Sequence, residues 1–357
     1  QNLEEVVVIG YGTAKRKDIT GSVASVNSET LAAIPVASAT EALQGKMAGV
    51  QITTTEGSPD AQMSIRVRGG GSITQSNEPL FIVDGFPVES ISDIPPTDIE
   101  SIDVLKDASS TAIYGARGAN GVIIVTTKSG KEGKVSVSYN AYYAWKKVAK
   151  TLDVLSASDY TKWQYELAQL TNKNDDYIKY FGNYQDLDMY DNVATNDWQD
   201  LTFGRTGHSF NHNLSINGGS DKFKYSFSYS HIDDKAIMQM SDYARDNLNL
   251  KLNHKPLKNV SLDFSARFSK TKINGGGSND ANSSLNTDKR LKYSLLYTPY
   301  PVPGISDALN ADEEDANSLL INPLISLRDN DTRKERINYN LAGSITWEII
   351  KDLKLKA

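Results

Sequence analysis

The sequence predicts the first strands of a membrane β-barrel, preceded by a mixed α/β unit. Three observations predict this class. From residue 134 onward, segments of about ten residues alternate apolar and polar side chains, and long and short connections between them alternate as well. Before residue 130 the pattern differs, with short helices, Gly-rich breaks and near-continuous apolar strands. Alternating ten-residue segments are typical of barrel strands that meet lipid on one face and the lumen on the other.

The composition fits this class and excludes others. The mean hydropathy of the 357 residues is −0.43, and no stretch approaches the roughly 18–20 apolar residues of a membrane helix. A barrel strand exposes only every second side chain to lipid, so a barrel can be hydrophilic on average. The net charge of −6 argues against a nucleic-acid partner. The absence of Cys removes disulfides, thiolate metal sites and Cys nucleophiles.

The chain begins with a strand-forming stretch. Residues 6–9 are Val-Val-Val-Ile, which favour extended backbone, and no hairpin turn is expected after them. An unpaired strand near a terminus is available for pairing with another chain. The alternative is that residues 4–9 form an edge strand of the unit that follows.

Residues 15–130 predict a compact mixed α/β unit. Ser38, with Glu41 three residues later, forms a capping box for a helix that should include Met47 and stop at Gly49. The other elements follow from β-branched runs, turn signals and a cap: strands at 50–55, 63–69, 99–107 and 121–128, a hairpin at 79–88 about Asp84-Gly85, and a helix at 107–114 capped by Asp107.

The alternating segments begin at residue 134 and recur at 208–217, 222–231, 247–253, 260–269 and 337–347. In the first segment one face carries Val135, Val137, Tyr139, Ala141, Tyr143 and Trp145. In the third, lipid should meet Phe223, Tyr225, Phe227 and Tyr229. The lumen or the N-terminal unit should then meet Lys224, Ser226 and Ser228, because a one-residue shift would place lysine in lipid.

The connections favour a barrel over a soluble β-sandwich, which also alternates. Connections 147–205 and 270–335 are very long, whereas 218–221, 254–259 and 348–353 are short. Outer-membrane barrels have long external loops and short periplasmic turns, which places the N-terminal unit on the periplasmic side. Six strands and the start of a seventh cannot close a barrel, so we expect this chain to be the N-terminal portion of a larger protein.

The motifs of residues 1–130 resemble, in order, those of the SusC/RagA family of TonB-dependent outer-membrane transporters. EEVVVIGYGT resembles the family's TonB-box region. Four further segments resemble successive motifs of the family's plug domain: EALQGKMAGVQI, IRVRGGGSI, PLFIVDGFPV and IESIDVLKDASSTAIYGARGANGVIIVTTKSGK. The resemblance implies a TonB-box region at 1–14, a plug domain at 15–130 inside the barrel, and the start of a 22-stranded barrel at 131–357.

The resemblance also implies a function. It implies TonB-dependent import of oligosaccharides across the outer membrane of a Gram-negative, Bacteroidetes-like bacterium, with oligopeptides as the alternative cargo. The implied partners are TonB with its ExbB/ExbD energy complex, a SusD-like surface lipoprotein, and outer-membrane lipid, in a dimer of transporter–lipoprotein pairs. The TonB-binding residues would be Glu5, Val6, Val7, Val8, Ile9, Gly10 and Tyr11. The outsider is a soluble β-rich adhesin or scaffold; nothing supports an enzyme.

Four charged plug residues are candidates for contacts with the barrel wall: Arg66, Arg68, Asp84 and Arg117. Ion pairs there would hold the plug until it is pulled, while the alternative is that the charges only make the plug surface soluble. No cofactor is expected, although the acidic run 312–315 in an external loop could bind Ca²⁺. The run YGARGANG at 114–121 lacks the Lys-Ser/Thr of a phosphate loop and indicates tight packing instead.

Overall fold

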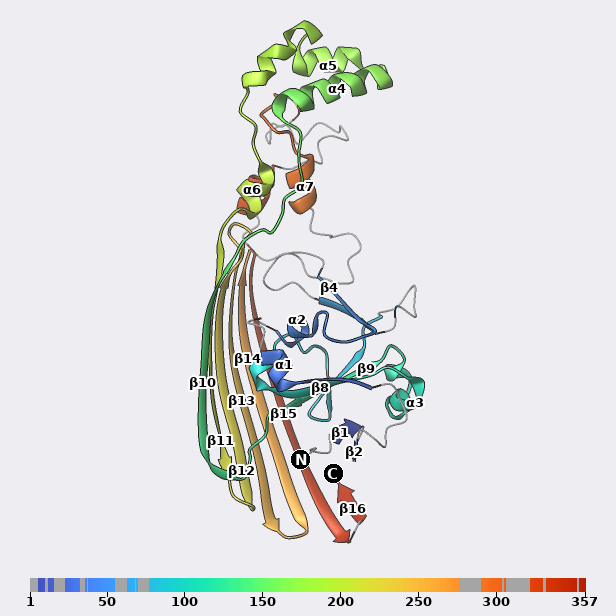
Figure 1. The fold of residues 1–357 in the computed structure, drawn as a ribbon, viewed down its shortest axis with the longest axis vertical. Coiled ribbons are helices and arrows are strands. Elements are labelled where there is room, and N and C mark those ends of the chain that lie inside the picture. The colour runs from blue at the N-terminus through green and yellow to red at the C-terminus, as the bar shows by residue number, and fades with distance from the viewer. Residues whose placement is uncertain are drawn as a thin grey trace.

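The structure is a computed structural model with two parts. It describes residues 6–9, 12–15, 23–32, 36, 38–54, 63–67, 69, 77–275, 290–303, 305, 322–329, 332–351 and 353–357. A tall, curved, seven-stranded sheet, called the wall below, forms one part, and the N-terminal unit lies against one face of it (Figure 1). None of the described helices is both long and apolar enough to cross a membrane.

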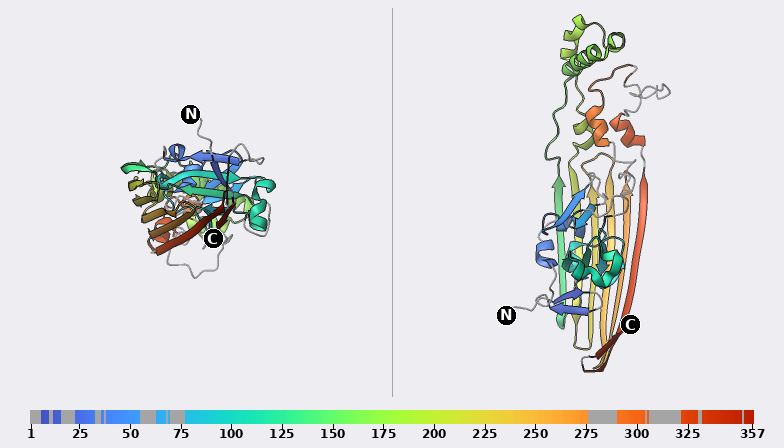
Figure 2. Two further views of the ribbon diagram at one scale, coloured as in Figure 1. Left: turned by 90° about the horizontal axis from the view of Figure 1, so that it is seen from below. Right: turned by 90° about the vertical axis from the view of Figure 1, so that its right-hand side faces the viewer.

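The wall is an antiparallel meander in which each strand pairs with its neighbours in sequence. Its strands are β10 (Gly133–Lys146), β11 (Gly207–Gly219), β12 (Phe223–Lys235), β13 (Asp242–Leu257), β14 (Val260–Asn274), β15 (Arg333–Ile350) and β16 (Leu353–Lys356). Seen from below, the strands form an arc on one side of the N-terminal unit (Figure 2). The alternating antiparallel strands are confirmed. The sheet is open, with β10 and β16 at its edges, so the count of 22 strands stays a prediction.

The two faces of the wall are apolar outside and polar inside, as the period of two predicts. On the outer face Tyr339 is 78% exposed and Leu341 is 68% exposed. On the inner face Asn213 is 2% exposed and Ser228 is 5% exposed, because the N-terminal unit covers them. The predicted register of β12 is confirmed, since its serines face inward while Phe223 is exposed outside.

The connections also follow the prediction. The helices of the long connections lie beyond one end of the wall, and the tight turns lie at the other end, toward which β1 (Val6–Ile9) and β2 (Gly12–Lys15) lie (Figure 1). The helices are α4 (Ala157–Thr171), α5 (Asn174–Phe181), η4 (Tyr184–Asn192), α6 (Trp198–Phe203), α7 (Arg290–Leu296) and α8 (Pro323–Asp329). The connection between β12 and β13 is only 236–241, because both strands extend further than their alternation indicates.

The N-terminal unit is built on a five-stranded sheet in the order β3-β8-β9-β6-β7. Its strands are β3 (Val23–Asn27), β6 (Leu80–Val83), β7 (Phe86–Val88), β8 (Ile99–Leu105) and β9 (Val122–Thr127), and a separate ribbon joins β4 (Val50–Thr54) to β5 (Met63–Val67). β9 is antiparallel to β8 and parallel to β6, which makes it central. Its apolar run is buried, as predicted, with Val122, Ile123 and Val125 at 0% exposure.

Local signals in this unit are confirmed with two exceptions. The hairpin turns at Asp84 (φ 52°) and Gly85 (φ 91°), the two positive φ values that a type I′ turn requires. Ser38 caps α2 (Ala39–Leu43), but the helix ends before Gly45 (φ 71°) and does not reach the predicted stop at Gly49. Asp107 occupies the N-cap position of α3 (Ala108–Thr111), yet its side chain makes no capping hydrogen bond. The chain then continues into η3 (Ala112–Gly118).

The prediction of an unpaired N-terminal strand is wrong. β1 (Val6–Ile9) forms an antiparallel pair with β2 (Gly12–Lys15), in a register that matches Val6 to Lys15 and Ile9 to Gly12. Only two residues separate the strands, so the nearest partner for the backbone groups of β1 is the stretch that follows it. Among the described strands, β1 pairs only with β2, which leaves its other edge without a described partner.

Candidate functional site between the N-terminal unit and the wall

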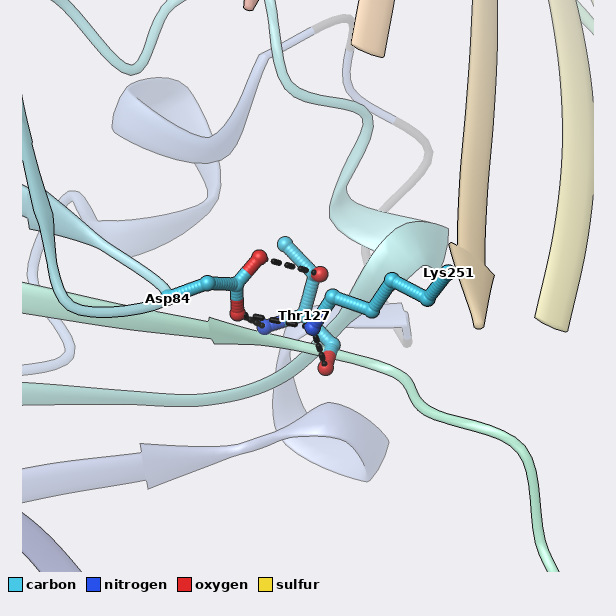
Figure 3. Close-up of polar contacts among 3 residues, drawn as sticks. All are labelled: Asp84, Thr127 and Lys251. Atoms are coloured by element: carbon cyan, nitrogen blue, oxygen red, sulfur yellow. Dashed lines mark hydrogen bonds and ion pairs between the residues drawn. The ribbon is translucent and has the colours of Figure 1, made fainter. Parts of the chain in front are cut away.

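A charged cluster joins the N-terminal unit to the wall at the β6–β7 turn (Figure 3). Asp84 Oδ1 accepts hydrogen bonds from the Thr127 amide at 2.9 Å and from Lys251 Nζ at 2.8 Å. Its Oδ2 accepts from Thr127 Oγ1 at 2.8 Å, and Lys251 Nζ also donates to the Thr127 carbonyl at 2.9 Å. Lys251 belongs to β13 and Thr127 ends β9, so one ammonium group links the wall to the β6–β7 turn and to the end of β9.

The ion pair is largely withdrawn from solvent. The side chains of Lys251 and Asp84 are 15% and 14% exposed. A buried pair contributes little net stability when compared with apolar residues, but removing one partner costs about 3–5 kcal/mol because the other charge is left uncompensated. The cluster of Asp84, Thr127 and Lys251, which we call the Asp84 latch, therefore holds the unit in one position on the wall.

A second carboxylate meets the wall without a direct ion pair. Asp98 ends the short helix η2 (Pro96–Asp98) and is 5% exposed. Its Oδ2 accepts from Ser228 Oγ at 2.8 Å, its Oδ1 accepts from Asn213 Nδ2 at 3.4 Å, and its carbonyl accepts from the Lys128 amide at 2.8 Å. Burial raises the pKa of the Asp98 carboxyl, although these side-chain hydrogen bonds and the charges of Lys128 and Arg245 act in the opposite direction.

This raised pKa links the contact to pH. The pKa of the Asp98 carboxyl is about 3.8 in the unfolded chain and higher in the folded protein. At a pH between these two values, Asp98 is protonated in the folded protein and ionised in the unfolded chain. Stability falls with rising pH wherever the folded state binds more protons. The contribution of Asp98 is therefore fully present below about 3.8 and is lost as the pH rises through the raised pKa.

Two further side chains of the wall reach the same segment of the unit. Arg245 Nη1 on β13 donates to the Ser92 carbonyl at 2.7 Å. Asn338 Nδ2 on β15 donates to Asp93 Oδ2 at 3.4 Å. With the Asp84 latch and Asp98, side chains from β11, β12, β13 and β15 all bind residues 84–98 or the end of β9, so this segment is the one that the wall grips.

The linker from β9 to β10 crosses the wall closely. A Cβ atom on Gly130 would lie 2.5 Å from both the backbone nitrogen and the carbonyl oxygen of Tyr225 on β12. Real Cβ atoms do not approach backbone so closely, so only glycine fits between the linker and this strand. The first residue of β10, Gly133, has φ 133° and turns the chain into the wall.

Of the four charged residues that sequence analysis proposes for this contact, three are described, and among these three the structure brings only Asp84 to the wall. Arg66 lies on β5 and is exposed, and Arg68 lies outside the described residues. Arg117 is exposed on η3 and lines a pocket of about 350 Å³ together with Pro79, Leu80, Phe81, Pro87, Val88 and Glu89. Neither described arginine has a hydrogen bond or ion pair to a described wall residue.

The remaining candidates are only partly described. Residues 6–9 form β1, whereas Glu5, Gly10, Tyr11 and the acidic run 312–315 lie outside the described residues. Among the residues that the structure describes, no cluster of three or more His, Cys, Asp and Glu is placed to hold a metal.

Sequence reasoning named neither Lys251 nor Asp98 as a contact residue, whereas it predicted Ser228 on the face that meets the lumen or the N-terminal unit. Lys251 is the one charged residue in the alternating run NLNLKLN, on its inward face, and this was the available signal. Asp98 follows Pro95-Pro96-Thr97 without any motif, and Ser228 is one of several inward serines. Their importance follows only from their positions opposite each other.

The far end of the wall carries an ordered head formed by residues 157–192. Its core packs Ala157, Ala168, Tyr177 and Phe181 against Tyr300 and Val302 of the second long connection. The Asn196 amide donates to the Pro299 carbonyl at 2.7 Å, and Trp198 Nε1 donates to the Thr298 carbonyl at 2.8 Å. The two long connections therefore form one packed structure above the wall.

Comparison with known proteins identifies relatives of both parts. Residues 15–122 match the family model of the TonB-dependent Receptor Plug Domain. The TonB-dependent receptor SusC of Bacteroides thetaiotaomicron is 40% identical over 253 residues, which are 68% of this chain and 24% of the relative. The TonB-dependent receptor P3 of Formosa agariphila is 40% identical over 286 residues, 80% of this chain and 26% of the relative. The chain thus spans about a quarter of the length of these relatives.

Solved structures resemble the whole arrangement. The RagAB peptide importer in its open-open state matches 99% of this chain and 41% of its own, with a TM-score of 0.75 and 27% identity. The siderophore receptor PirA of Acinetobacter baumannii matches 94% of this chain with a TM-score of 0.51 and 14% identity, which is a likeness of fold alone.

Proposed function

We propose that this chain, a member of the SusC/RagA family of TonB-dependent receptors, forms the plug and the first barrel strands of an energy-coupled nutrient importer of the outer membrane. The observation that carries the proposal is the polarity of the wall. Its outer face exposes large apolar side chains, and its inner face buries Ser and Asn against the N-terminal unit. A soluble β-sandwich buries its apolar face instead, so this polarity favours a wall that meets lipid outside and a plug inside.

In this proposal the N-terminal unit is the plug, and the Asp84 latch and Asp98 keep it seated. TonB adds as a strand to β1 in the region Glu5–Tyr11, where main-chain hydrogen bonds provide affinity. Because β1 already pairs with β2, TonB either adds to the other edge of β1 or displaces β2. Pulling then moves the plug away from its contacts on β11, β12, β13 and β15, and no covalent chemistry takes place in the chain.

The cargo that we propose is oligosaccharide, the cargo that the family resemblance implies. Oligopeptide is the second candidate, and the RagAB structures, which are those of a peptide importer, support it. A SusD-like surface lipoprotein captures the ligand above the wall, TonB with ExbB/ExbD supplies energy, and the working assembly is a dimer of transporter–lipoprotein pairs.

Uptake by cells that express the full-length protein tests the function. Radiolabelled oligosaccharides and oligopeptides should bind in the presence or absence of the proton-motive force, whereas accumulation of the true cargo should require it and require TonB. Accumulation that persists without TonB would contradict the proposal. The class of unlabelled compound, oligosaccharide or oligopeptide, that competes with the labelled cargo for uptake identifies the class that is transported.

A further inference from the structure

The helix α4 exposes an apolar row on the side that faces away from its own core. Trp163, Leu167 and Leu170 are 48%, 39% and 83% exposed. Their spacing of four and three residues places them on one helical face, and we call them the α4 stripe. The opposite face is already buried, since Ala157, Thr161 and Ala168 are 1%, 0% and 7% exposed. An amphipathic helix normally has one apolar face, and α4 has two.

The orientation of α4 is set by its ends and its core. Ser156 Oγ accepts from the Asp159 amide at 3.1 Å at the N-terminus, and Asn172 (φ 54°) ends the helix in a left-handed conformation. Thr161 Oγ1 and the Tyr300 hydroxyl form a buried hydrogen bond between the two long connections. The α4 stripe is therefore presented outward by a built scaffold, at the end of the molecule farthest from the turns of the wall (Figure 1).

Charge indicates which kind of surface covers the stripe. The head, residues 157–192, contains seven Asp and Glu and three Lys, a net charge of −4. Helices that lie on membranes carry Lys and Arg on their polar face, whereas Asp159 and Glu166 flank the α4 stripe. A protein surface with basic residues around an apolar groove complements the head, and a lipid surface does not.

We propose that the α4 stripe docks into an apolar groove, rimmed by Lys and Arg, on the surface lipoprotein of the importer. Apolar anchors at positions i, i+4 and i+7 are the pattern by which a helix binds in a groove. The acidic head steers the basic rim during encounter, and the stripe supplies the buried contact. This inference rests on the proposed function and adds to it the surface through which transporter and lipoprotein meet.

The test uses the full-length transporter and the lipoprotein that co-purifies with it. A Trp163→Asp/Leu170→Asp variant should raise the Kd for the lipoprotein about tenfold or more, because aromatic anchors dominate interface energies. Gln169→Asp adds a negative charge to the same helix on another face and should leave the Kd within about twofold of wild type. The rate at which the wild-type proteins associate should fall as the salt concentration is raised from about 50 to about 500 mM, because salt screens the attraction between the acidic head and the basic rim.

Three results would overturn the inference. The double variant could keep the wild-type Kd while its head remains folded by circular dichroism and protease resistance. It could lose association between transporter copies rather than association with the lipoprotein. Wild-type protein could bind anionic vesicles through the stripe. A wild-type transporter that imports cargo without any lipoprotein would refute the docking surface and leave the import function intact, whereas loss of import in wild type would refute the function itself.

Discussion

Replacing Lys251 with Met should weaken the attachment of the N-terminal unit to the wall by about 3–5 kcal/mol. The two side chains of the ion pair are 15% and 14% exposed, and the atoms Lys251 Nζ and Asp84 Oδ1 lie 2.8 Å apart. Met fills a similar volume but leaves the Asp84 carboxylate buried with only its two hydrogen bonds to Thr127. The cost arises because a largely buried carboxylate has lost the ammonium group paired with it, while the Arg267 guanidinium attracts Asp84 without forming an ion pair with it.

Native-state hydrogen exchange of the full-length protein in detergent measures this effect. The Thr127 amide donates to Asp84 Oδ1, so the free energy of opening at that amide reports directly on the latch. Lys224→Met is the matched control, because Lys224 alternates onto the same inner face of β12 and has no ion pair to any described residue. The control should change the opening free energy by less than about 0.5 kcal/mol.

A double-mutant cycle separates the latch from general damage. Asp84→Asn and Lys251→Met should each destabilise the contact, and the double variant should be more stable than the sum of the two effects by about 1.5 kcal/mol or more. Effects that add within about 0.5 kcal/mol would show that the two residues act independently. That result would refute the idea that their ion pair seats the N-terminal unit.

Four other predictions follow from the same structure. Asp98→Asn should remove the loss of stability that begins as the pH rises above about 3.8, because the amide cannot ionise; a pH series of thermal unfolding with an unchanged slope would contradict this. Deleting residues 4–12 should abolish uptake and preserve ligand binding, and growth of the deletion strain on the cargo as sole nutrient would refute the TonB-binding assignment. A membrane-impermeant label should not reach a cysteine placed at Gly219 in intact cells, since the β11–β12 turn lies opposite the head; labelling there would reverse the orientation. Phe227→Lys on the outer face should reduce insertion by about 2–4 kcal/mol, whereas Ser138→Lys on the inner face of β10, opposite Ser215, should cost less; the reverse order in liposomes would overturn the barrel register.

The sequence by itself determined the local geometry of both parts. The period of two in β12 indicated which side chains face outward, because successive side chains of a strand point to opposite faces. Asp84-Gly85 indicated the hairpin, because the two positive φ values of a type I′ turn favour these residues. Ser38 with Glu41 indicated a helix start for the same kind of reason, since the cap is a contact between residues three apart.

The N-terminal strand shows where such reasoning fails. The run of Val6 to Ile9 is a strong strand signal, but in β2 (Gly12–Lys15) only Thr13 favours strands, and the four residues show no alternation. Propensity describes how well one strand fits a sheet and says little about which segment pairs with it. The pairing was decided by proximity in the chain and was therefore invisible in the pattern of either strand alone.

Only the tertiary structure decided which charged residues meet across the contact. Asp84, Arg66 and Arg117 are equivalent candidates in sequence, and Asp98 carries no signal at all, yet Asp84 and Asp98 bind the wall and the two arginines are exposed. The choice depends on how a five-stranded sheet is rotated and shifted against the strands of the wall. A shift of one residue along a wall strand, about 3.3 Å, exchanges the inward and outward side chains. Local patterns define the faces of each part, and the docking of one part on the other, which involves residues more than a hundred positions apart, selects the partners.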